Sequence, residues 1–146
     1  MLTHHRKTAV RPAVVAAVVL LGSLGCGPAG PKTYPIQGKV ELVAGDVAQL
    51  TGSHVEAVLA NDPTVRTSGT IRPDGGFTLE TLRAGTILKG TQEGTYQVRI
   101  ILPDDDRKNR RLAARALAPR FLQFNTSGLS FQVPADDDVT LRVSQR

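Results

Sequence analysis

Residues 71–80 read IRPDGGFTLE, and this stretch indicates the fold more clearly than any other part of the chain. The proline presets φ for a turn and the two glycines tolerate positive φ, so a tight turn is predicted between two strands. After the turn, Phe77 and Leu79 alternate with polar residues, and residues 65–71 show a weaker alternation before it. The stretch therefore predicts a β-hairpin with Phe77 in the core.

The same period of two recurs on both sides of this hairpin, as expected for strands with one buried face. The expected strands cover residues 34–42, 54–59, 65–71, 77–80, 96–102, 129–133 and 139–143. The Gly- and Thr-rich residues 83–94 are expected to form a loop, and the last two strands are expected to form a hairpin. About seven short strands with turn signals between them predict an all-β fold, an antiparallel Ig-like sandwich.

The N-terminus has the layout of a signal peptide. Basic residues precede an apolar run that begins at Ala13 and ends at Cys26, where glycines and prolines follow. A membrane-spanning helix needs about 20 apolar residues, so this run is too short to remain as an anchor. Residues 24–26, with small Ser23 before them, resemble the lipobox of bacterial lipoproteins, although the larger and the small residue stand in the opposite order. We expect a cleaved signal peptide over 1–25 and a lipidated Cys26.

The expected organisation is a signal peptide, then Cys26 with a Gly/Pro tether over 26–33, then one domain over 34–146. Acyl chains on Cys26 would hold the protein durably at a membrane, because lipoprotein cysteines carry two or three chains. Gly27 follows the cysteine instead of the acidic residue that retains lipoproteins at the inner membrane. This favours a place in the cell envelope at the outer membrane, facing the periplasm.

Charge argues against a nucleic-acid partner. The chain has 18 Lys and Arg against 13 Asp and Glu, but three of the basic residues lie before Cys26, which leaves 15 against 13. The basic character of the whole chain is therefore partly a property of the leader. Cys26 is also the only cysteine, so the domain cannot contain an internal disulfide.

The candidates for catalysis are few, and we expect no enzyme and no cofactor. After the leader the chain has one histidine, His54, beside Ser53, and neighbours on a strand point to opposite faces. Another serine could reach His54 only through folding. The chain has no tryptophan, and Tyr34 and Tyr96 fall on apolar strand faces, which disfavours an aromatic carbohydrate platform.

Two acidic runs, 104–106 and 136–138, raise the possibility of calcium binding. Calcium loops space their ligands at alternate positions with a glycine for the turn, and three adjacent aspartates do not follow that pattern. A zinc site would have to be built from His54 and carboxylates alone. We therefore expect solvated turns and no metal site.

The basic residues gather in residues 107–120, where Ala and Leu favour a helix over about 107–118. Lys108, Arg111 and Arg115 are three and four residues apart and share one helical face, with Leu112 and Ala116 on a neighbouring one. The segment is interpreted as a solvated helical insertion. The alternative is contact with anionic lipid headgroups or another polyanion.

Several motifs resemble those of one known family. They are IQGKV at 36–40, PDGGFTL at 73–79, EGTYQV at 93–98, and the region from Pro119 to Leu129. Together they resemble small bacterial lipoproteins with a carboxypeptidase regulatory-like domain. The resemblance implies a transthyretin-like (prealbumin-like) β-sandwich with no catalytic residues, serving as an accessory or binding module. Residues 45–52 and the basic segment depart from the family pattern.

Two functions remain open on this basis. The first is a lipid-anchored, non-enzymatic envelope protein whose β-sandwich serves as a binding or structural module, with an unidentified envelope protein as a possible partner. The second is an envelope protein that binds polyanions or anionic headgroups through residues 107–120.

Overall fold

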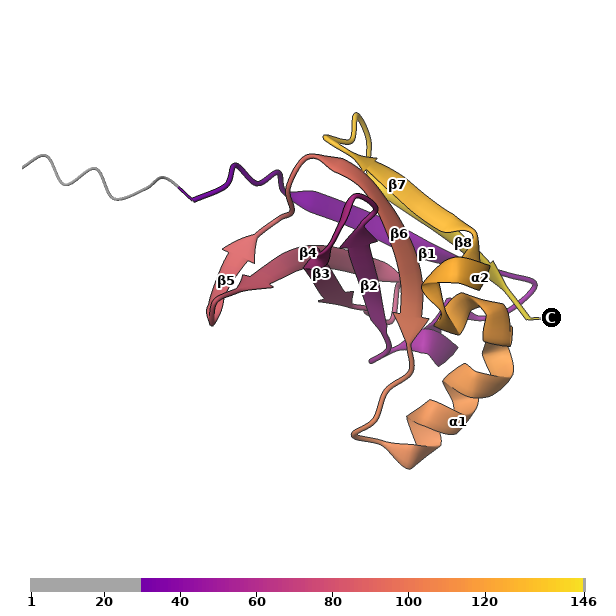
Figure 1. Ribbon diagram of the computed structural model, residues 1–146. Helices are drawn as coiled ribbons and strands as arrows, with labels where there is room; N and C mark the ends of the chain where they lie inside the picture. The colour runs from indigo at the N-terminus through magenta and orange to yellow at the C-terminus, as the bar shows by residue number, and fades with distance from the viewer. Residues whose placement is uncertain (1–29, 146) are drawn as a thin grey trace, which may run out of the picture.

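The computed structural model describes residues 30–145, and the predictions for Cys26 and the leader concern residues outside this range (Figure 1). The described part is mainly β, with two short α-helices and two 3-10 helices. The elements are β1 Ile36–Val43, η1 Val47–Leu50, β2 His54–Leu59, β3 Asp62–Thr70, β4 Gly76–Arg83, β5 Thr86–Lys89, β6 Gly94–Ile101, α1 Arg107–Ala116, η2 Pro119–Leu122, α2 Phe124–Ser127, β7 Leu129–Val133 and β8 Val139–Ser144.

The all-β prediction is confirmed. The strands are hydrogen-bonded in the order β7-β6-β2-β3-β4-β1-β8, and β5 pairs with β4. Strand β4 is shared, because residues 76–79 pair with β1, whereas residues 80–83 pair with β3 and β5. The sheet turns over at β4 and encloses the core in a sandwich-like, partly barrel-like arrangement (Figure 1).

Three details of the predicted topology were wrong. There are eight strands in the described residues, because β5 forms inside the segment 83–94 that was expected to be a loop. The sheet is mixed, since β1 and β8 run parallel from Gly38 opposite Val139 to Val43 opposite Ser144. The last two strands do not form a hairpin: β7 pairs with β6 and β8 with β1, so residues 134–138 carry the chain between opposite ends of the strand order.

The turn at 73–76 forms as predicted. Arg72 and Gly76 bracket it, with Arg72 N donating to Gly76 O at 2.9 Å and Gly75 N donating to Arg72 O at 2.8 Å. Gly75 has a φ of 83°, a value that glycine adopts without steric cost. Asp74 Oδ1 accepts a hydrogen bond from Gly76 N at 2.9 Å, which fixes the loop in place.

The core follows the alternation read from the sequence. The buried positions of β1 alternate strictly with exposed ones, and Phe77 of β4 is fully buried. A Cβ on Gly38 would lie 2.3 Å from the Phe77 ring and 2.4 Å from Val139 O, so the bare backbone of β1 makes room for the ring. The largest fully buried side chains are Tyr96, Phe77, Leu50, Ile71, Leu79, Ile100 and Leu141.

Helix α1 confirms the helical insertion expected near 107–118. Asp106 caps its N-terminus by accepting hydrogen bonds from Lys108 N at 2.7 Å and Asn109 N at 3.3 Å. The helix packs against η1 through Ala113 and Ala116, whereas Leu112 is 39% exposed. The prediction that Leu112 and Ala116 line up on one face therefore holds only for Ala116 on the packing side, because Ala113 and Ala116 are the buried residues of the helix. The short helix α2 that follows was not predicted.

Candidate functional site

The N-terminal tether enters the fold beside the connection between β5 and β6. Tyr34 N donates to Thr91 O at 2.8 Å and Thr91 N donates to Tyr34 O at 2.9 Å, a two-bond bridge that fixes the chain just before β1. A Cβ on Gly90 would lie 2.1 Å from Tyr34 O, so the residue after β5 lies directly against the entering chain. Lys32 Nζ lies 4.8 Å from the centre of the Tyr34 ring.

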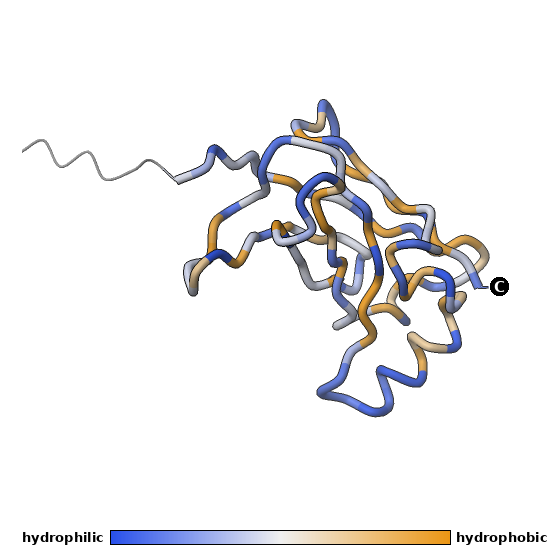
Figure 2. The backbone as a smooth tube through the Cα atoms, in the orientation of Figure 1, coloured by the Kyte–Doolittle hydropathy of each residue, from blue (hydrophilic) through white to orange (hydrophobic). Residues whose placement is uncertain are grey.

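The β4–β5 hairpin projects from the same end of the molecule. Figure 1 shows β5 on the side where the N-terminal segment leaves the domain, with α1 on the opposite side. Leu82 and Ile87 lie opposite each other on the two strands and are 70% and 64% exposed. The tight turn between the strands passes through Ala84 and Gly85, both with positive φ. Figure 2 shows the apolar residues of β5 at this outlying position.

The basic residues predicted on one helical face are all exposed. Lys108, Arg111 and Arg115 lie on α1, and no ion pair involves them within residues 30–145. The exposed Leu112 lies next to Arg111 in the chain and one turn from Lys108 and Arg115. This basic face lies at the end of the domain away from the tether (Figure 1).

A charged cluster that the sequence did not predict lies on the outer face of β2, β3 and β6. Glu56 accepts a hydrogen bond from Arg99 Nε at 2.6 Å and one from Arg66 Nη1 at 3.3 Å. The guanidinium carbons of these arginines lie 4.7 Å and 5.9 Å from the centre of the Phe124 ring of α2. Both oxygens of this carboxylate accept a hydrogen bond from an arginine, so the cluster is a structural arrangement that ties β2 to β3 and β6.

Serine and histidine are separated, as the strand geometry predicts. Ser53 is fully buried and its Oγ has no hydrogen-bond partner in the described residues. His54 is partly exposed, and its Nδ1 lies 3.3 Å from Thr70 Oγ1. The two side chains therefore do not form a nucleophile and base pair.

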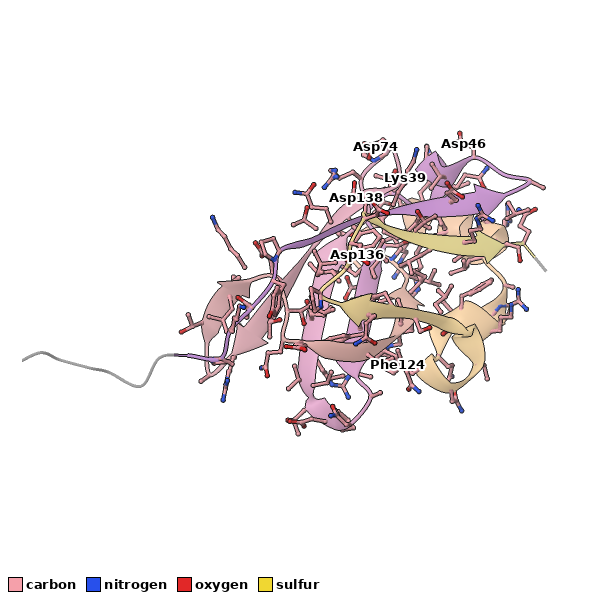
Figure 3. All side chains as sticks on the ribbon, turned by 90° about the horizontal axis from the view of Figure 1, so that it is seen from above. Lys39, Asp46, Asp74, Phe124, Asp136 and Asp138 are labelled. Carbon is pink, nitrogen blue, oxygen red and sulfur yellow. The ribbon has the colours of Figure 1, made fainter. Side chains whose placement is uncertain are left out.

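The acidic runs are exposed turns. Residues 136–138 border a shallow surface depression together with Pro35, Ile36 and Gln37. Figure 3 shows Asp136 and Asp138 on the loop that leads into β8. Within residues 30–145 no group of three or more His, Cys, Asp or Glu side chains is placed to hold a metal ion.

Both tyrosines lie where the alternation placed them. Tyr96 is fully buried and stacks on Phe131 with ring centres 5.2 Å apart and an interplanar angle of 6°. Its hydroxyl accepts a hydrogen bond from Thr91 Oγ1 at 2.6 Å and donates one to Gln92 O at 3.0 Å. Burial raises the pKa of Tyr96 above its ordinary value. Tyr34 is partly buried against the core.

Sequence reasoning missed the exposed hairpin and the charged cluster for different reasons. The hairpin carries a local signal, since an apolar pair flanks the Ala84–Gly85 turn. The cluster carries almost none, because Glu56 and Arg99 become neighbours only through the pairing of β2 with β6.

Comparisons with known proteins give no relative. No family model, no curated protein and no solved structure matches this chain. In the part that the structure describes, no helix is long and apolar enough to cross a membrane.

Proposed function

We propose that this chain is a lipid-anchored protein of the bacterial cell envelope whose β-sandwich serves as a binding or structural module. One observation carries the proposal: a basic leader and an apolar run end at Cys26, the only cysteine in the chain. Cys26 stands where the apolar run stops, which is the position of the acylated cysteine in bacterial lipoproteins. Acylation of this residue gives the cysteine a role.

The length of the tether supports the same reading. Tyr34, which is fixed by its two hydrogen bonds to Thr91, lies eight positions after Cys26. A fully extended chain of that length spans about 26–29 Å. Acyl chains at Cys26 would thus hold the domain close to a membrane surface and leave it room to turn. Gly27 favours the outer membrane, facing the periplasm.

The type of module is proposed from the family resemblance. The motifs at 36–40 and 73–79 that resemble carboxypeptidase regulatory-like domains pair with each other, since Ile36 to Lys39 lie opposite Leu79 to Gly76. They form one paired unit of the sheet, with Phe77 over Gly38. The apolar residues Ile36, Phe77 and Leu79 of these motifs are buried in the core, which supports a structural role for the motifs.

The test is Cys26→Ser in the full chain, expressed in a bacterium with a lipoprotein pathway. The parent should take up a fatty-acid probe and fractionate with membranes, and the variant should do neither. Cys26→Ala serves as a second variant, because both remove the thiol that receives the acyl chain. Equal labelling of the parent and both variants would overturn the proposal.

A second candidate function is contact with anionic headgroups or another polyanion through the 107–120 segment. The observation that favours it is the basic face of Lys108, Arg111 and Arg115, exposed and without ion pairs in the described residues. Each basic residue close to an anionic membrane contributes about 1 kcal/mol, an effect that salt weakens. The position of α1 away from the tether argues for an auxiliary role.

This candidate is tested by replacing Lys108, Arg111 and Arg115 with Gln. Binding to anionic vesicles is measured for parent and triple variant at low and physiological salt. Replacing Lys39, Arg72 and Arg142 instead gives a control with the same loss of charge elsewhere on the surface. If the parent does not bind at low salt, or if both triple variants bind equally, the basic face has no such function.

A further inference from the structure

We propose that the tip of the β4–β5 hairpin is a membrane-docking element: Leu82 and Ile87 enter the interfacial region of the bilayer that carries the acyl anchor. The inference rests on the proposed lipid anchor and adds the surface by which the domain meets the lipid. It is carried by three observations, which are the exposure of the apolar pair, its distance from the tether, and its small area.

The exposure of this pair is not accounted for by the fold. Leu82 and Ile87 are the two most exposed of the large apolar residues in the described chain, at 70% and 64%. They are partners across the hairpin, so both side chains leave the same face of the strands. A single exposed leucine needs no explanation, but a register-matched pair on a projecting hairpin is an apolar tip.

The tether places this tip within reach of the lipid. Gly90, three residues after Ile87, lies against Tyr34, so the hairpin begins where the anchored chain enters the fold. Three residues of extended strand span about 10 Å, and eight residues from Tyr34 back to Cys26 span at most about 29 Å. Figure 1 shows β5 and the N-terminal segment on one side of the domain.

The size of the patch selects lipid over protein. A standard protein interface buries about 800 Å² on each partner, which two side chains cannot supply. Membrane contact by a tethered domain needs much less, because the acyl anchor makes the second contact intramolecular. Lys89 at the end of β5 also disfavours addition of a strand from another chain to this open edge.

The surrounding charges fit an interfacial position. Arg83 and Lys89 are exposed at the ends of β4 and β5, and Lys32 is exposed on the tether. Their long side chains can reach headgroup phosphates while the apolar pair lies deeper. Three exposed carboxylates, Asp62, Glu80 and Glu93, also lie near this end, so apolar contact must supply most of the affinity.

The chain contains no tryptophan, so one introduced tryptophan reports on a single site. The acylated full-length protein, matured in the cell, is purified as Ile87→Trp and as Val43→Trp and reconstituted into vesicles of phosphatidylethanolamine and phosphatidylglycerol. Val43 is the matched control, because it is 55% exposed and lies at the other end of β1, about 30 Å from Tyr34. The readout is quenching by lipids brominated on their acyl chains.

We expect blue-shifted emission from Ile87→Trp and quenching at least threefold stronger than for Val43→Trp. Adding Leu82→Asp to Ile87→Trp should abolish most of that quenching. Equal quenching of the two single variants, or none in either, overturns the inference. A blue shift that depends on protein concentration without quenching means that a second copy covers the hairpin, which also overturns it.

Fatty-acid labelling of the same samples separates the two levels of the proposal. A labelled protein that floats with the vesicles but shows no quenching at position 87 refutes docking and leaves the lipid anchor standing. A protein without label refutes the anchor, and the docking inference falls with it.

Discussion

Replacing Phe77 with alanine tests the central packing contact of the fold. The ring is fully buried against the bare backbone of Gly38, which has no side chain that could fill the space left by the ring. Large-to-small changes of this kind cost about 3–5 kcal/mol, because apolar transfer energy is lost and a cavity remains. That is a large share of the roughly 5–15 kcal/mol that stabilises a typical domain.

The measurement is urea and thermal unfolding of residues 27–146, followed by far-ultraviolet circular dichroism. At roughly 4 °C per kcal/mol for a domain of this size, the Tm should fall by about 12–20 °C. Leu82→Ala is the control, since Leu82 is exposed and should cost less than about 0.5 kcal/mol. A loss below about 1 kcal/mol for Phe77→Ala would contradict the burial of this ring in the core. It would mean that β4 is shifted by one residue and shows its other face to the core.

Three further predictions concern two polar side chains and the isolated domain. Tyr96→Phe should cost about 1–2 kcal/mol at neutral pH, because it removes both hydrogen bonds of a buried hydroxyl. Burial raises the pKa of Tyr96. The parent protein therefore has the full stability contributed by the protonated phenol below pH about 10, and it loses this stability as pH rises through the folded-state pKa. Unfolding curves from pH 8 to 12 should show a smaller loss of stability at alkaline pH in the variant. Glu56→Gln should lower the free energy of unfolding in urea by about 1–2 kcal/mol, because Arg66 and Arg99 lose their shared carboxylate. The control Glu41→Gln, at the exposed pair with Arg142, should cost no more than about 0.5 kcal/mol. Equal losses in the two variants would contradict the role of partial burial. Residues 27–146, which contain no cysteine, should fold as a β-rich monomer, and a far-ultraviolet circular dichroism spectrum dominated by helix would contradict this prediction.

The strands were predictable because each buries one face. The alternation around Val40, Val55 and Val98 is local, and so is the turn at Gly75, so the sequence alone placed these elements. Strand β5 was missed because Ile87 and Leu88 stand between a Gly-rich turn and a lysine, with too few residues to show a period. A strand of four residues is defined mainly by its pairing with a neighbouring strand, and that pairing with β4 forms only in the folded chain.

Pairing between distant segments was the part that sequence reasoning could not reach. Nothing in Val139 to Ser144 states that its neighbour is β1 rather than β7, since both choices bury the same apolar face. The antiparallel hairpin was the simpler expectation because the connecting loop is short. The cluster of Glu56, Arg99 and Phe124 depends on the same long-range register and was invisible for the same reason.

The parallel pairing of β1 with β8 has a mechanical consequence. The N-terminal end of β1 and the C-terminal end of β8 lie at opposite ends of the pair, so a force drawn between Tyr34 and Ser144 pulls the two strands past each other. The hydrogen bonds between β1 and β8, from the pair Gly38–Val139 to the pair Val43–Ser144, then bear the load together. An antiparallel pair pulled in the same way would open one bond at a time from its end. A domain held by its N-terminal tether and pulled at its far end would therefore resist as a shear clamp.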